Sequence, residues 1–148
     1  MVKNIAMFGN IALKTKCTEV KDLGSDRVKV IAQDIIDTMQ RFNGIGLSAN
    51  QISITERIIV VTDIKTKEVL TFVNPEIVMN SKDMEFDIEG CLSYPNIKKN
   101  IKRYKSITMR AFDLEGLEVV WSTDGYQARI IQHEVAHTQG KCLVSRKG

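Results

Sequence analysis

Two short segments contain residue types that could together carry out metal-dependent hydrolysis. Positions 133–137 read His-Glu-Val-Ala-His, and positions 89–93 read Glu-Gly-Cys-Leu-Ser. Residues four positions apart share one face of an α-helix, so His133 and His137 could bind one metal ion while Glu134 acts on a water molecule beside it. Catalytic sites of this kind use three protein ligands and keep one position open. Cys91 is the obvious candidate for the third ligand.

Each segment alone is a weak signal. Two histidines and a glutamate can occur by chance on a solvated helix, and a single cysteine is more often a small buried apolar residue than a ligand. These are, however, the chain's two histidines, and apolar neighbours such as Ile131 and Val135 suggest a buried helix. Unpaired imidazoles would be costly there, which favours a metal site.

Length and composition indicate one ordinary globular domain spanning residues 1–148. The chain is 43% hydrophobic and 26% charged, with a formal net charge of +3 that gives little reason to expect specific DNA binding. The N-terminal residues have no signal-peptide or transit-peptide pattern, and no membrane association is expected. Three cysteines make a disulfide framework improbable and favour free or metal-bound thiols in a reducing cytoplasm.

Apolar periodicity predicts a long helix, several strands and a final helix that carries both histidines. The first helix spans about 25–42 and ends at a glycine-containing loop, residues 43–46. The final helix is capped within 122–124, continues to about Gln139 and is closed by Gly140. The expected strands are 57–62 and 69–73, which form a hairpin, followed by 76–79, 106–112 and 117–121. This order indicates an α+β fold of mostly antiparallel strands packed around a central metal-binding helix.

Three motifs taken together resemble the peptide deformylase family. They are Gly-Ile-Gly-Leu-Ser-Ala-Asn-Gln at 44–51, Glu-Gly-Cys-Leu-Ser at 89–93 and Gln-His-Glu-Val-Ala-His at 132–137, within a resemblance that extends from about Gly9 to Val144. The resemblance implies a hydrolase that removes the N-terminal formyl group from formyl-methionyl polypeptides emerging from the ribosome and releases formate. It implies cytoplasmic action, in a host cytoplasm if the protein is viral.

The resemblance also implies a role for each site residue. One divalent ion, Fe²⁺ natively and replaceable by Zn²⁺, Ni²⁺ or Co²⁺, would be held by Cys91, His133 and His137. Glu134 would be the general acid and base, and the Gln51 side-chain amide and Leu92 backbone N–H would stabilise the oxyanion. The implied substrate-binding residues are Gly44, Ile45, Gly46, Leu47, Glu89, Gly90, Arg129 and Ile130.

The chain departs from the family pattern in ways that keep two alternatives open. Position 136 is Ala where the family usually has Asp, which suggests an inactive deformylase-like protein that only binds peptides. A zincin-type endopeptidase is the other alternative, but it typically needs a third His or Glu downstream, and the eleven residues after His137 contain neither. The same short end resembles compact family members without the C-terminal extension used for ribosome docking, so any ribosome contact is expected to use another surface.

Overall fold

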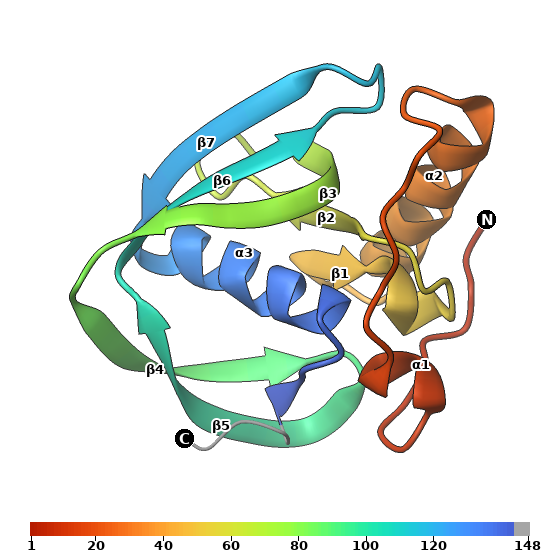
Figure 1. The fold of residues 1–148 in the computed structure, drawn as a ribbon. Coiled ribbons are helices and arrows are strands. Elements are labelled where there is room, and N and C mark those ends of the chain that lie inside the picture. Colours follow the sequence, from red (N-terminus) through yellow and green to blue (C-terminus); the bar gives the residue numbers. More distant parts are fainter. Residues whose placement is uncertain (144–148) are drawn as a thin grey trace.

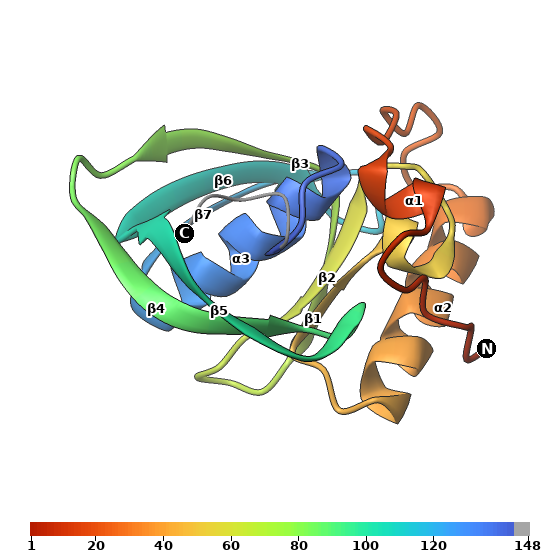
Figure 2. The same ribbon diagram turned by 90° about the horizontal axis from the view of Figure 1, so that it is seen from below.

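Helix α3 (Gly125–Thr138) lies between two antiparallel sheets, with helix α2 (Asp26–Arg41) on the far side of the larger sheet (Figures 1 and 2). The structure is a computed structural model and describes residues 1–143. Eleven of the fourteen residues of α3 are buried, polar ones included. The helix that carries both histidines is therefore the centre of the molecule.

The larger sheet has five strands in the order β1-β2-β3-β6-β7, each antiparallel to its neighbours. Alternate residues of β2 serve two cores: Ile58 and Val60 pack with α2, whereas Ile59 and Val61 pack with α3. Burial on both faces explains the uninterrupted run of β-branched residues in this strand. The strands are β1 (Gly46–Ser48), β2 (Ile58–Thr62), β3 (Val69–Asn80), β6 (Ser106–Phe112) and β7 (Glu118–Asp124).

The smaller sheet is a ribbon of two strands, β4 (Met84–Cys91) and β5 (Tyr94–Tyr104), on the opposite side of α3. Cys91 pairs with Tyr94 and closes the hairpin, so Leu92 and Ser93 form its two-residue loop. The ribbon thereby presents Cys91 at the end of a strand, next to a tight turn.

Helix α2 follows the amphipathic pattern predicted from its apolar spacing. It begins after Ser25, whose hydroxyl accepts a hydrogen bond from the Val28 N–H at 3.2 Å. Two short elements complete the set: α1 (Ile11–Lys14) and the 3₁₀ turn η1 (Ala49–Ile52). Within residues 1–143, no helix has the length and apolarity that crossing a lipid bilayer requires.

The α+β fold predicted from the sequence is confirmed, with local corrections. The strands expected at 69–73 and 76–79 are one strand, β3, because a bulge between Val73 and Glu76 lets pairing with β6 continue. Residues 122–124, expected to cap the last helix, instead complete β7, and only Asp124 serves as the N-cap. Neither strand of the ribbon, β4 or β5, was among the predicted strands. The family resemblance up to Val144 and the expectation about the short C-terminal end reach beyond the described residues.

Candidate active site

Two segments distant in sequence, the end of β4 and helix α3, bring Cys91, His133 and His137 together. The Nε2 atoms of the two histidines, one helical turn apart on α3, are 3.2 Å apart. The Cys91 Sγ atom, at the end of β4, lies 3.3 Å from His137 Nε2. The three candidate ligand atoms all lie within 4.8 Å of one another, as the sequence predicted for a shared metal ion.

The donor set and its spacing fit a divalent ion. Ligands of one tetrahedral ion bound through sulfur and nitrogen are separated by roughly 3.3–3.6 Å, given usual bond lengths. The two measured separations of 3.2 and 3.3 Å are close to this range. Burial lowers the pKa of His137 well below its usual value, and the neighbouring His133 lowers it further. His137 therefore stays neutral, which is the form that binds a metal.

The carboxylate of Glu89 fixes the orientation of His133. The Nδ1 atom of His133 is 2.8 Å from Glu89 Oε1, which leaves Nε2 directed towards His137 and Cys91. Arg103 donates to both carboxylate oxygens at 2.8 Å, and Arg129 donates to Oε2 at 2.7 Å. Burial alone would raise the pKa of Glu89, but the hydrogen bonds from Arg103 and His133 outweigh it and hold that pKa well below its usual value. Glu89 is therefore a permanent anion behind the ligand helix.

Glu134 occupies an apolar, sheltered position beside the three candidate ligands. Its Oε1 atom is buried without a hydrogen-bond partner in the described part of the chain. Burial raises the pKa of Glu134 to about 7, so its carboxyl group can both accept and release a proton near neutral pH. A Cβ atom at Gly46 would lie 2.7 Å from Glu134 Oε2, so only glycine lets strand β1 come this close.

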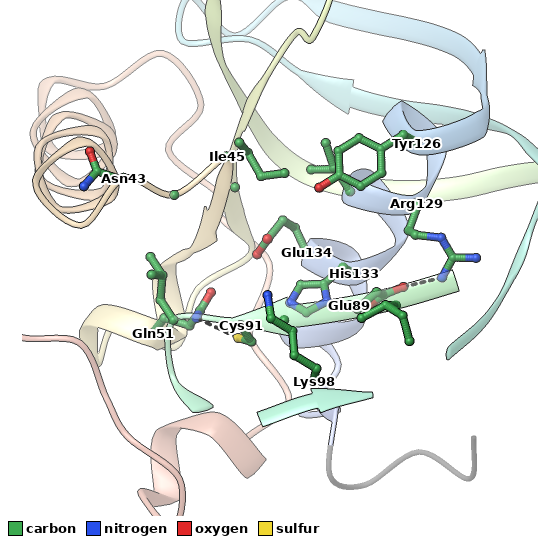
Figure 3. A pocket seen from close by; sticks show the side chains of 16 residues that line it. Asn43, Ile45, Gln51, Glu89, Cys91, Lys98, Tyr126, Arg129, His133 and Glu134 are labelled. Atoms are coloured by element: carbon green, nitrogen blue, oxygen red, sulfur yellow. Dashed lines mark hydrogen bonds and ion pairs between the residues drawn. The ribbon is translucent and has the colours of Figure 1, made fainter. Parts of the chain in front are cut away.

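The amide of Gln51 is held in one orientation. Its Oε1 atom accepts from the Ser48 backbone N–H at 3.1 Å, so its Nε2 atom points towards Ser93 Oγ at 3.0 Å and Cys91 Sγ at 3.4 Å. Figure 3 shows this amide beside Cys91, to which a dashed line joins it. A fixed N–H donor close to the candidate ligands is suited to stabilising a developing oxyanion.

These groups surround a pocket of about 450 Å³. It is lined by Asn43, Gly44, Ile45, Gly46, Gln51, Ile88, Glu89, Gly90, Cys91, Leu92, Lys98, Tyr126, Arg129, Ile130, His133 and Glu134. Most of the site residues predicted from the sequence line this pocket. His137 lies behind the pocket wall, fully buried, and the Leu47 side chain packs in the core with α2.

Four of the lining residues were not predicted as site residues from the sequence: Asn43, Ile88, Lys98 and Tyr126. Two of them carried a usable signal. Tyr126 precedes Ile130 by four positions and His133 by seven, which places it on the same helical face. Ile88 precedes Gly90 by two positions on β4, and residues two apart in a strand share a face.

The structure shows that Arg129, expected to bind substrate, directs its guanidinium group elsewhere. Its side chain lines the pocket, but Figure 3 shows the charged end turned towards Glu89. The same guanidinium donates to the backbone carbonyls of Ile101 and Glu85, both at 2.8 Å.

Comparison with known proteins gives one consistent result. A family model described as polypeptide deformylase matches residues 2–147. Peptide deformylase 1 of Clostridium perfringens is 38% identical over 146 residues, 99% of this chain and 98% of that protein. The crystal structure of peptide deformylase from Thermotoga maritima has a TM-score of 0.94 at 31% identity, covering 100% of this chain and 99% of that one. A class I type b peptide deformylase from Acinetobacter baumannii, solved with Met-Ala-Ser bound, has a TM-score of 0.92 at 31% identity, with 99% of both chains covered.

Proposed function

Because the chain belongs to the polypeptide deformylase family, and is therefore a hydrolase that removes the N-terminal formyl group of nascent polypeptides, we propose how its own residues perform that reaction. The observation that carries the proposal is the convergence of Cys91, His133 and His137 beside the buried carboxyl group of Glu134. We propose that residues 1–148 act as a single domain in the cytoplasm, on chains emerging from the ribosome.

Cys91, His133 and His137 would hold one divalent ion. A thiolate with two imidazoles suits borderline ions, and we propose Fe²⁺ as the native one, with Zn²⁺, Ni²⁺ and Co²⁺ as substitutes. When bound, the ion supplies a Lewis acid that polarises the formyl carbonyl group and lowers the pKa of a water molecule. Glu89 holds His133 in the orientation that this ligation requires.

Glu134 would move the proton. Its carboxylate accepts a proton from the attacking water as the new C–O bond forms at the formyl carbon. It then delivers that proton to the amide nitrogen as the formyl C–N bond breaks, so the products are formate and a peptide with a free amine. A pKa of about 7 suits both steps, since it lies near the pH at which they take place.

Gln51 and the hairpin loop would stabilise the oxyanion. The Gln51 Nε2 atom is already aimed at Cys91 and Ser93, on the side of the pocket where the formyl oxygen would lie. The Leu92 backbone N–H, in the loop after Cys91, is the second proposed donor. Removing one such donor typically costs 10²–10³-fold in kcat.

The rest of the pocket would bind the methionine and the peptide that follows it. Ile45, Leu92 and Ile130 provide apolar surface for the methionine side chain, whose burial is worth about 1.5–3 kcal/mol. Strand β1 lies at one end of the sheet, so one of its edges is open to pair with an extended peptide. The A. baumannii relative binds Met-Ala-Ser, the product of deformylating such a peptide, and this supports the proposal.

The zincin and inactive-binder alternatives are less well supported. The three candidate ligands include Cys91 from the ribbon and no residue that follows α3, which differs from the zincin pattern. Ala136 is buried, but the bonds of Glu89 to His133 and Arg103 form without an acid at that position. The loss of the usual Asp therefore leaves the orientation of His133 intact.

The proposed metal site can be tested by replacing its cysteine. Cys91→Ala should abolish stoichiometric metal binding and lower the melting temperature of the metal-loaded protein, because metal binding contributes to folding stability. Metal content is measured by elemental analysis of anaerobically purified protein. Cys17→Ala and Cys142→Ala are matched controls that should keep the metal. Equal metal content in all three variants would rule out the Cys-His-His site.

A further inference from the structure

The proposed metal ligands come from two units of the fold that share no sheet. His133 and His137 lie on α3, whereas Cys91 lies at the end of the β4–β5 ribbon, which is not hydrogen-bonded to the five-stranded sheet. The separation of the thiol from the imidazoles therefore depends on how the ribbon is fixed against α3. Figure 2 shows the ribbon crossing the helix as a separate layer.

Two buried side chains of α3 join the helix to the ribbon by hydrogen bonds. Arg129 donates to the carbonyl of Glu85 on β4, to the carbonyl of Ile101 on β5 and to the Glu89 carboxylate, at 2.7–2.8 Å. Gln132 binds the backbone of Tyr104 on β5 twice, accepting from its N–H at 3.0 Å and donating to its carbonyl at 2.9 Å.

Charge neutralisation alone does not account for Arg129. The Glu89 carboxylate already has a bidentate partner in Arg103, which lies on the ribbon itself. Arg129 adds a second buried positive charge, although Arg103 alone can neutralise the carboxylate. Burying a charge is costly unless its hydrogen bonds are satisfied. What Arg129 adds is direct bonding to both strands of the ribbon and to the residue that orients His133.

We propose that Arg129 is a positioning residue that sets the distance between the ligand helix and the strand that carries Cys91. It does so by clamping both strands of the ribbon and Glu89 to α3, with Gln132 as a second clamp one turn further along the helix. This inference rests on the proposed Cys-His-His metal site. The guanidinium group of Arg129 faces the ribbon, and the rest of its side chain lines the pocket, where the predicted contact with substrate would be made.

The test compares the full-length parent with Arg129→Met, which keeps an unbranched apolar stem but removes the guanidinium group and its donors. Four measurements are made: affinity for Co²⁺ by competition with a chelating dye, the visible spectrum of the Co²⁺-loaded protein, hydrogen–deuterium exchange, and steady-state kinetics with a formyl peptide. The control is Arg110→Met, because Arg110 forms an exposed ion pair with Glu118 on the other sheet.

We expect Arg129→Met to weaken Co²⁺ affinity about 10–100-fold, the usual effect of losing a residue that orients metal ligands. Its thiolate-to-cobalt absorption should be reduced, and exchange should be faster in residues 84–104 while α2 and β2 are unchanged. At saturating Co²⁺, kcat for a formyl peptide should fall more than KM rises. Arg110→Met should match the parent in every measurement.

Unchanged Co²⁺ affinity, spectrum and ribbon exchange together with a raised KM would overturn the proposal and show that Arg129 contacts substrate. Faster exchange in every element with unchanged Co²⁺ affinity would also overturn it, by showing only general destabilisation. If Arg129→Met does not fold, Arg129→Lys replaces it in the test. A single ammonium group cannot reach both carbonyls and Glu89, so we expect a Co²⁺ affinity between that of Arg110→Met and complete loss. A Co²⁺ affinity equal to that of the parent would contradict the clamp. A parent that binds no Co²⁺ would refute the underlying metal site instead.

Discussion

At the scale of single residues, the environment of Glu134 gives an ordinary carboxyl group the properties of a proton carrier. The side chain is buried against Gly46, one oxygen has no partner among residues 1–143, and burial raises the pKa to about 7. Glu89, also buried, behaves oppositely because Arg103 and His133 bond to it. Two glutamates of one site thus differ in function because their partners differ.

Glu134→Gln tests this assignment. The amide has nearly the shape of the carboxyl group but cannot accept the proton, so kcat should fall by about 10²–10⁴-fold while the metal content stays at the parent value. Formate release under saturating formyl peptide and elemental analysis measure the two quantities. A variant that hydrolyses the peptide at the parent rate would show that another group carries the proton.

At the scale of secondary-structure elements, the site depends on how closely β1 approaches α3. Gly46 is the first residue of β1, and a Cβ atom there would meet Glu134 at 2.7 Å from Oε2 and 3.1 Å from Cγ. The open edge of β1 is also the proposed peptide-binding edge. The same glycine therefore determines the position of both the proton carrier and the substrate strand.

Gly46→Ala should displace the Glu134 carboxyl group and lower kcat/KM by about 10²-fold, since misplacement of about 1 Å can have that effect. The fold should persist, because the added methyl group would clash with the Glu134 side chain and with no backbone atom. Steady-state kinetics and circular dichroism provide the comparison, with Val120→Ala on the exposed face of β7 as control. Parent-like kinetics in Gly46→Ala would mean that the close approach has no catalytic consequence.

The sequence predicted those elements whose signals are local. Helix α2 has an N-cap and regular apolar spacing, β2 is a run of β-branched residues, and β6 alternates, so each was predicted nearly to its ends. Strand β4 was missed although Met84, Phe86 and Ile88 alternate with three acidic residues, which is the same period-two signal as in β6. Unlike the apolar residues of β6, Phe86 and Ile88 are exposed in the structure.

The residues of the site were likewise predicted from the sequence only in part. The metal-ligand candidates and Glu134 were identifiable because they lie in short motifs whose spacing has a chemical reason. The partners of Glu89 were not, since Arg103 and Arg129 are fourteen and forty positions away and meet it only through the packing of the ribbon on α3. Contacts that depend on tertiary packing leave no local pattern in one sequence.

At the scale of the whole molecule, α3 is held by both sheets and carries most of the chemistry. One core joins α2 to the outer face of the large sheet, and a second joins α3 to its inner face, so the sheet forms a rigid wall behind the helix. The ribbon closes the other side and brings Cys91 into place. Residues from β1, the ribbon and α3 then surround one pocket, as deformylation of an extended peptide requires.

The most direct test of the central claim is mass spectrometry of formyl-Met-Ala-Ser incubated with the metal-loaded protein, alongside a formate assay. We expect one formate and one new free amine per peptide, with the Met-Ala and Ala-Ser bonds intact, and no reaction by Cys91→Ala. Internal cleavage fragments would contradict it in favour of an endopeptidase, and binding of the peptide without formate release would contradict it in favour of an inactive peptide-binding protein.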